Sequence, residues 1–484
     1  MADTAAQAQY DNDQLYAEHK KVYPQSVHGP FRRLKWAILI LTLGVYYLLP
    51  FVRWDRGPNA PDQAVLVDLP GRRFYFFFIE IWPQEVYYFT GLLIIAALLL
   101  FLANALAGRV WCGYTCPQTV WTDLFLTVER WTEGDRRARI KLDESPWTLS
   151  KARKKLAKHG LWLLIAWWTG GVWVLYFADA PTLVWQLATF QAPAVAWIWI
   201  GIFTFTTYLL AGFAREQVCT YMCPWPRIQA ALTDEDALNV TYRLDRGEPR
   251  ASLKKAAALE RKGNHVGDCI DCYQCVAVCP TGIDIREGIQ LECIQCGLCI
   301  DACDTVMRKV NRPTGLIGYD TDLNIAAREA GKPTRYRFIR PRTIIYVALI
   351  AVISAVMLAQ LLTRDDFGIN VLHDRNPQFV RLSDGGIRNG YTVRVLNKAL
   401  EARDFALGVE GIPGVRLEVI GLETPDSATT EVEVGPDTTR ELRVLVFAPP
   451  GATPEVSTPV TFTATNRATG QVLSTGDYFK SPGD

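Results

Sequence analysis

Histidine is scarce in this 484-residue sequence, with five residues in all, and no Cys-x-x-Cys-His motif is present. Covalent attachment of a c-type haem is therefore excluded. The apolar stretches offer no facing pair of histidines for a b haem, and no convincing dinucleotide fingerprint is found. The net charge is only +1, which gives no reason to expect a nucleic-acid partner. The sequence therefore does not identify the electron donor of any redox chemistry.

The first 30 residues are polar, without an apolar core or a small-residue cleavage site, so we expect no cleavable signal peptide. Apolar residues, in contrast, are abundant: 49% of the chain is hydrophobic and 15 residues are tryptophan. Five uncharged stretches approach the length of a membrane-spanning helix, and we expect spans at about 36–52, 86–107, 160–178, 194–214 and 343–363. Buried helices of a large soluble protein are the alternative, but Arg342 and Arg364 bracket the last stretch like interfacial anchors.

Basic residues predict the orientation of these spans. The loop between the second and third stretches carries eleven Lys and Arg residues, and the loop between the third and fourth carries none. We therefore expect a membrane protein with its N-terminus in the cytoplasm and its C-terminus outside. Residues 53–85 should be external but contain four arginines and the apolar run 74–82, so an external, interfacial or re-entrant position stays open.

Eight of the 12 cysteines form a doubled Cys-x-x-Cys-x-x-Cys-x-x-x-Cys run between positions 269 and 303. This spacing is typical of two [4Fe–4S] clusters, in which three thiolates of one run share a cluster with the fourth thiolate of the other run. We expect the first cluster to be bound by Cys269, Cys272, Cys275 and Cys303. We expect the second to be bound by Cys293, Cys296, Cys299 and Cys279. Zinc sites or disulfides are the alternatives, but neither requires a doubled four-cysteine run.

The other four cysteines form two matching Cys-x-x-x-Cys-Pro motifs, each just after the cytoplasmic end of an expected span. Residues four apart share one face of a helix, the proline suits the start of a following helix, and a helix start should lower a thiol pKa. Two such pairs could supply four soft ligands for Cu(I), zinc or iron; small buried residues at a helix end are the alternative. The candidate residues are Cys112, Cys116, Cys219 and Cys223.

The sequence after Arg364 has no cysteine, and its composition shifts to short alternating runs rich in Val and Thr, separated by Gly and Pro turns. Roughly seven strands of this kind predict an immunoglobulin-like β-sandwich. The fold class is thus a multi-domain membrane protein with about five transmembrane helices, a cytoplasmic ferredoxin domain and an external sandwich. We expect a tail at 1–34, a four-helix membrane domain at 35–214, a second motif and linker at 215–262, the ferredoxin domain at 263–312, a linker at 313–342, the fifth span at 343–363 and the sandwich at 364–484.

In combination, these parts resemble the FixG/CcoG/RdxA proteins, accessory factors for cbb3-type cytochrome c oxidase. The resemblance rests on LPGRRFYFFFIEIWPQ (69–84), RVWCGYTCPQTVW (109–121), CTYMCPW (219–225) and CIDACDTVMRKVNRPTGLIGYDT (299–321). It implies an oxidoreductase that reduces Cu(II) to Cu(I), with the paired cysteines as catalytic copper ligands. It also implies copper ions and copper chaperones or oxidase assembly factors as partners, and a place in the bacterial inner membrane with the sandwich in the periplasm.

Two other functions compete with this expectation. The chain could be an electron conduit to a membrane partner enzyme, as in related membrane ferredoxins of nitrate and nitrous oxide respiration. It could also be an assembly scaffold whose clusters are structural. The electron donor and the oligomeric state, including a homodimer, are left open.

Overall fold

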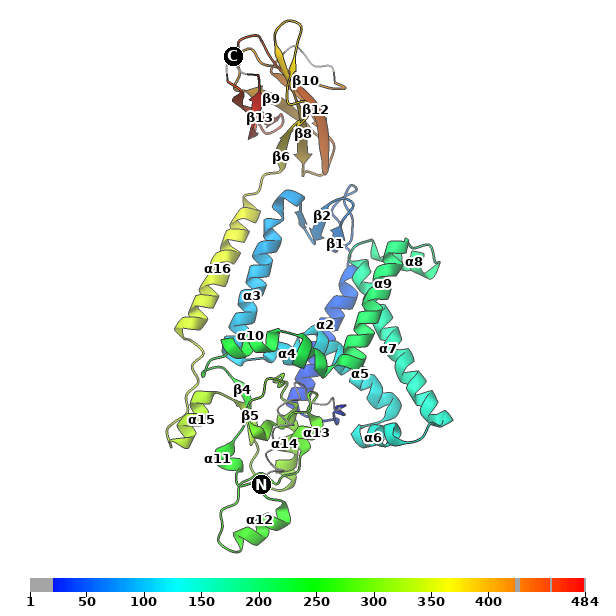
Figure 1. The fold of residues 1–484 in the computed structure, drawn as a ribbon, viewed down its shortest axis with the longest axis vertical. Helices are drawn as coiled ribbons and strands as arrows, with labels where there is room; N and C mark the ends of the chain where they lie inside the picture. The colour runs from blue at the N-terminus through cyan, green and yellow to red at the C-terminus, as the bar shows by residue number, and fades with distance from the viewer. Residues whose placement is uncertain (1–20, 423–426, 453–454, 483–484) are drawn as a thin grey trace, which may run out of the picture. The chain divides into compact units, whose positions relative to one another are not determined.

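The structure is a computed structural model and describes residues 21–422, 427–452 and 455–482. The chain divides into two compact units (Figure 1). The first unit comprises Met1–Val52 and Gln63–Met357, and the second comprises Arg53–Asp62 and Leu358–Asp484.

Among the described residues, four helices are long and apolar enough to cross a membrane, and they coincide with four of the five predicted spans. They are α2 (Pro30–Leu48) with η1 (Leu49–Phe51), η2 (Pro83–Glu85) with α3 (Tyr87–Ala107), α9 (Ala194–Thr207) with the π-helix η3 (Tyr208–Ala214), and α16 (Pro341–Leu362). The first helix begins six residues before the predicted start at Trp36, because Gly29-Pro30 supplies a helix start and Arg32 and Lys35 are buried within it.

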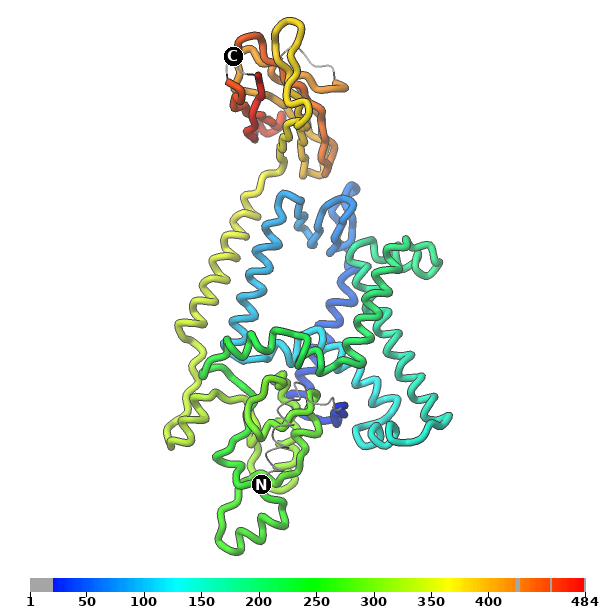
Figure 2. Tube along the Cα trace, viewed as in Figure 1, coloured from blue at the N-terminus to red at the C-terminus, as the bar shows by residue number. Residues whose placement is uncertain are grey.

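The stretch predicted as the third span is helical but lies within a longer helix, α7 (Leu149–Leu175). The first turns of α7 are basic and its apolar part is rich in Trp and Gly, so its composition is less apolar than that of the four candidate spans. Figures 1 and 2 show α7 and α9 side by side. At Gly170 a Cβ atom would lie 2.9 Å from the Ile200 carbonyl oxygen, so glycine allows this close approach. A short helix, α8 (Ala180–Ala188), connects the two.

The apolar run at 74–82 forms neither a helix nor a loop. It contributes two strands to a three-stranded antiparallel sheet of β1 (Val65–Asp68), β2 (Arg73–Phe76) and β3 (Ile79–Ile81). Alternation is seen in β2, where Tyr75 is buried while Phe74 and Phe76 are more exposed.

The ferredoxin region is larger than predicted. The segments at 215–262 and 313–342, which the sequence suggested were linkers, pair with each other as an antiparallel sheet. The elements between the third and fourth candidate spans are η4 (Val218–Met222), α10 (Trp225–Leu232), β4 (Asn239–Tyr242), α11 (Leu244–Gly247), α12 (Leu253–Glu260), α13 (Gln274–Val278), η5 (Ile285–Glu287), α14 (Leu298–Lys309), β5 (Ile317–Asp320) and α15 (Asp322–Glu329).

The second unit contains a two-sheet sandwich, as predicted, with nine described strands rather than about seven. One sheet has the order β10-β12-β8-β6, with β7 beside β8, and the other has the order β11-β9-β13-β14. The strands are β6 (Phe367–His373), β7 (Val380–Arg381), β8 (Ile387–Asn397), β9 (Arg403–Glu410), β10 (Arg416–Val419), β11 (Thr429–Val434), β12 (Thr438–Ala448), β13 (Ser457–Asn466) and β14 (Val472–Lys480). Residues at alternate positions of both sheets, such as Val393, Val395, Phe405 and Phe462, are fully buried and form the core.

Candidate metal centres

The eight cysteines of the doubled run line two separate cavities. One cavity is lined by the four cysteines predicted for the first cluster: Cys269, Cys272, Cys275 and Cys303. The other is lined by Cys275 and by the four cysteines predicted for the second cluster: Cys279, Cys293, Cys296 and Cys299. The ligand sets remain a prediction, which this geometry supports.

The donor set fits a cubane better than a single ion. Among the described residues, no three metal-binding side chains converge tightly enough to hold one metal ion. A [4Fe–4S] cluster instead carries its thiolates on separate irons, so its ligands surround a volume rather than a point. Burial raises the pKa of Cys275 and of Cys303 to about 12, so these buried thiols would need bound metal to stabilise their thiolate forms.

The doubled sequence also has a doubled backbone conformation. In each run the residues on either side of the second cysteine have positive φ: Asp271 and Tyr273 in the first run, Gln295 and Gly297 in the second. Each run then enters a helix, α13 or α14, which carries the third cysteine. Glycine adopts positive φ readily, whereas the other three residue types do so much less often. Gly297 is therefore the clearest signal of this conformation in the sequence.

Each Cys-x-x-x-Cys-Pro motif spans the end of a helical segment rather than one helical face, contrary to the expectation. Cys112 lies within α4 (Val110–Tyr114), and Cys116 is the N-cap of α5 (Pro117–Glu133), whose first residue is the predicted proline. Cys219 lies in the π-helix η4, and Cys223 follows its last residue. The two motifs therefore differ in local structure despite their matching sequences.

The structure nevertheless brings the four cysteines together. Burial raises the pKa of Cys112 to about 12, and the nearby Cys116, Cys219 and Cys223 thiols act in the same direction. Burial likewise raises the pKa of Cys219 to about 11. The expected lowering of the pKa by a helix start is thus wrong for these two thiols, because burial outweighs any effect of a helix start.

The first cysteine pair packs directly against the second ferredoxin run. A Cβ atom at Gly113 would lie 2.7 Å from the Ile294 carbonyl oxygen and 3.1 Å from Cys296 Cα. The Tyr114 hydroxyl donates to the Cys296 carbonyl oxygen over 3.0 Å. Cys112 and Cys296 belong to one buried apolar cluster, against which Cys219 also packs. The first cysteine pair and Cys219 therefore pack against the second ferredoxin run.

Two polar side chains face this region. Cys112 Sγ donates to Gln229 Oε1 over 3.2 Å, and Gln229 is buried. The Trp225 indole Nε1, two residues after Cys223, is buried and has no hydrogen-bond acceptor among the residues that the structure describes. An orphaned buried donor costs free energy, and a thiolate or a bound group beside the cysteines would satisfy it.

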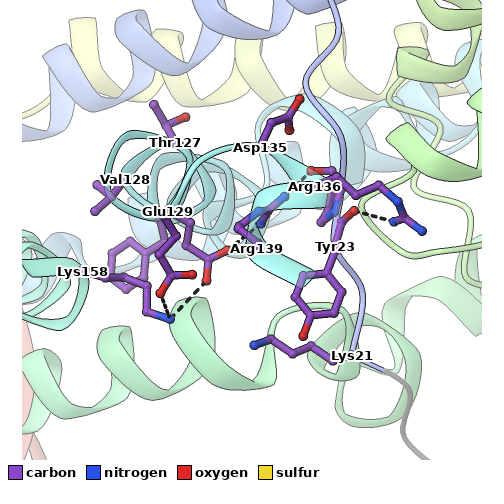
Figure 3. Close-up of polar contacts among 12 residues, drawn as sticks. Lys21, Tyr23, Thr127, Val128, Glu129, Asp135, Arg136, Arg139 and Lys158 are labelled. Carbon is purple, nitrogen blue, oxygen red and sulfur yellow. Dashed lines mark hydrogen bonds and ion pairs between the residues drawn. The ribbon is translucent and has the colours of Figure 1, made fainter. Parts of the chain in front are cut away.

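A buried ionic network lies beside the second pair. Glu129, on α5, accepts from Arg215 Nη2 over 2.6 Å and from Arg139 Nη1 over 2.8 Å, and Lys158 Nζ lies at 3.6 Å. Figure 3 shows Glu129 between Arg139 and Lys158. Burial acts to raise the pKa of Glu129, but the three cations together hold it below its ordinary value. Arg215 stands four residues before Cys219, so this network fixes the entry to the second motif.

The N-terminal segment covers the same region. Arg136, on α6 (Arg136–Glu144), donates to the Tyr23 carbonyl oxygen over 2.6 Å, and Lys21 Nζ lies 2.6 Å from Asp143 (Figure 3 labels all but Asp143). At the start of α2, Asp301 of α14 accepts from the Arg32 backbone N–H over 2.7 Å. The ferredoxin region therefore caps a candidate membrane helix directly, a link between distant residues that no sequence motif signals.

Comparison with known proteins agrees with this architecture. Residues 214–322 match a family model described as a 4Fe–4S dicluster domain, and residues 89–132, which contain the first cysteine pair, match one described as a 4Fe–4S binding domain. Residues 357–482 match the immunoglobulin-like fold at the C-terminus of FixG. With the four candidate spans, these findings define a membrane iron–sulfur protein with an immunoglobulin-like domain.

Full-length relatives identify the family. The nitrogen fixation protein FixG of Rhizobium meliloti is 52% identical over 90% of this chain and 88% of its own length. Protein RdxA of Cereibacter sphaeroides is 51% identical over 92% of each chain. Protein RdxB of the same organism is 52% identical over 90% of this chain and 91% of its own. The chain belongs to the FixG/RdxA family.

Proposed function

We propose that this membrane iron–sulfur protein reduces Cu(II) to Cu(I) during assembly of a cbb3-type cytochrome c oxidase. In this proposal Cys112, Cys116, Cys219 and Cys223 bind the copper substrate and draw together on it, since no three of them converge on one point among the described residues. The observation that carries it is the direct packing of the first cysteine pair against the second ferredoxin run.

Thiolates are soft ligands that hold Cu(I) in preference to Cu(II), so binding at the four cysteines favours the reduced ion. Each Cu(II) ion takes up one electron. When bound, the two clusters supply such electrons, and their potentials can be tuned over a range wide enough for copper. Gly113 and Tyr114 keep the copper ligands beside the second run, and the orphaned Trp225 N–H is available to a thiolate there.

We further propose that α7 crosses the membrane together with the four candidate spans, that the N-terminus and all twelve cysteines are cytoplasmic, and that the sandwich is periplasmic. The eleven basic residues between the second and third predicted spans, against none between the third and fourth, support this orientation. Copper chaperones or oxidase assembly factors are the proposed partners, since a Cu(I) product needs an acceptor that holds it as a soft ion.

A third [4Fe–4S] cluster is the main alternative at the paired cysteines. It is favoured by the match of residues 89–132 to a 4Fe–4S binding domain. Iron analysis separates the readings: two clusters contain about eight iron atoms per chain and three contain about twelve. If the chain were an electron conduit, the four cysteines would not bind copper. If it were a scaffold, variants with inactive clusters would still support oxidase assembly.

Paired substitutions test the copper site. Replacing Cys112 and Cys116 by alanine should leave iron content unchanged, slow oxidation of the reduced protein by Cu(II), and weaken Cu(I) retention. Replacing Cys219 and Cys223 should do the same, and the two changes together should add little, because groups that act as a unit are not additive. Thr115→Ala, between the first two cysteines, is the matched control and should behave like wild type. Loss of four iron atoms in either paired variant would instead indicate a third cluster.

A further inference from the structure

Arg109 connects the three cysteine-bearing segments of the site. Its guanidinium donates to the Pro226 carbonyl oxygen over 2.7 Å, just after the second cysteine pair. It also donates to the Leu291 carbonyl oxygen and, over 3.4 Å, to that of Cys293 in the second ferredoxin run. Cys112 follows three residues later in the chain.

The backbone conformation at Gly108 and Arg109 allows these contacts of the guanidinium. Gly108 has a φ of +52°, and a Cβ atom there would lie 2.6 Å from both Asn239 Oδ1 and Gln295 Oε1. Only glycine at this position therefore allows the sharp turn of the chain after α3. The Arg109 N–H then donates to Gln295 Oε1 over 2.8 Å, which aligns the arginine with the second run.

Arg109 is a buried cation without a carboxylate partner. It is 7% exposed, and within the part of the chain that the structure describes it forms no ion pair with an acidic side chain. Arg215, before the second cysteine pair, is instead paired with Glu129. Burying a charge without a counter-ion is strongly unfavourable. Burial lowers the pKa of Arg109, whereas Cys112, Cys293 and Glu292 act to raise it.

Metal binding would supply the missing counter-charge, because cysteines bind metals as thiolates. Cys112 and Cys293 lie on either side of Arg109, and each belongs to a different proposed metal site. Reduction adds a further negative charge, which a fixed cation in a low-dielectric region stabilises.

We propose that Arg109 is a positioning residue whose fixed charge holds the first cysteine pair against the second ferredoxin run and favours the reduced state of the cluster bound there. This inference rests on the proposed ligand set of Cys279, Cys293, Cys296 and Cys299. It predicts that the charge, more than the exact shape of the side chain, sets the reduction potential.

The test compares R109Q, which removes the charge but keeps an amide donor, with R109K, which keeps the charge but loses the guanidinium fork. Iron content and the two cluster potentials are measured on the full-length, cluster-loaded protein in detergent, by potentiometric titration followed by electron paramagnetic resonance. R109Q should lower one potential by about 59 mV or more, a tenfold change for a one-electron couple. The other potential should stay in place, and R109K should remain near wild type.

A normal iron content with no shift in R109Q, an equal shift of both potentials, or equal shifts in R109Q and R109K would overturn the inference. Should R109Q fail to retain iron, R109K decides: retention of iron at the wild-type potential supports the role of the charge, and loss of iron overturns it. A wild-type protein with far fewer than about eight iron atoms would contradict the proposed ligand sets instead.

Discussion

Glu129 offers a direct test of how the second cysteine pair is held in place. E129Q keeps the shape of the side chain but removes the anion that pairs with Arg139, Lys158 and Arg215. The structure gives Arg139 and Arg215 no other carboxylate partner within the described residues, so the substitution leaves two buried guanidiniums uncompensated. Removing one partner of a buried ion pair costs about 3–5 kcal/mol.

The matched control is E133Q, one turn further along the same helix. Glu133 is as buried as Glu129, but its partners Lys155 and Lys158 retain contacts with Asp143 and Glu129 when it is removed. We therefore expect a loss nearer 1 kcal/mol, comparable to an ordinary hydrogen bond.

Thermal unfolding in detergent, followed by tryptophan fluorescence, measures both variants. At about 2 °C per kcal/mol for a unit of this size, E129Q should lower the midpoint by about 6 °C or more. E133Q should lower it by less than half as much. Equal shifts in the two variants, or a shift below about 2 °C in E129Q, would refute the assignment of Glu129 as the shared counter-ion.

Three further predictions concern the clusters, the topology and pH. C272S should reduce iron below about eight atoms per chain and destabilise the neighbouring cluster, because each cluster takes a ligand from the other run; an unchanged iron content would contradict the ligand sets. A reporter fused after Asp484 should be active only if it works in the periplasm, and one at Arg250 only if it works in the cytoplasm; the same side for both would rule out the proposed orientation. Burial acts to raise the pKa of Asp143, but its hydrogen bonds hold the pKa below the ordinary value, so its stabilisation is present above about pH 4 and is lost at lower pH. The stability difference between wild type and D143N should therefore shrink as the pH falls from about 5 to 2, and a difference that grows would contradict this sign.

Local patterns in the sequence predicted the parts of the fold that depend on local rules. Cysteine spacing predicted which thiols line each ferredoxin cavity, since a run of three thiolates and a helix fix that geometry within about ten residues. Uncharged length predicted four of the spans, and alternation predicted the sandwich. These signals act over one helix or one strand.

The parts of the fold that the sequence did not predict depend on contacts between distant residues. β4 and β5 pair across more than 70 residues of intervening sequence, and neither four-residue strand has a distinctive pattern. In the sequence, Arg139 and Lys158 contributed only to the excess of basic loop residues that predicted the orientation. In the fold, both are buried against Glu129. The third predicted span is not among the four candidate spans for a different reason: the tryptophans that suggested a membrane belt lower the mean hydropathy of α7, which is otherwise long enough to cross a membrane.

The central claim is that copper is reduced at the paired cysteines. Anaerobic, dithionite-reduced protein, freed of excess reductant, is mixed with Cu(II) in a stopped-flow instrument while the iron–sulfur absorption band and a Cu(I) chelator are followed. Wild type should form one Cu(I) per electron lost from the clusters. The variant with alanine at positions 112, 116, 219 and 223 should retain its iron but react much more slowly. Wild-type rates in that variant, or cluster oxidation without Cu(I), would contradict the proposed function.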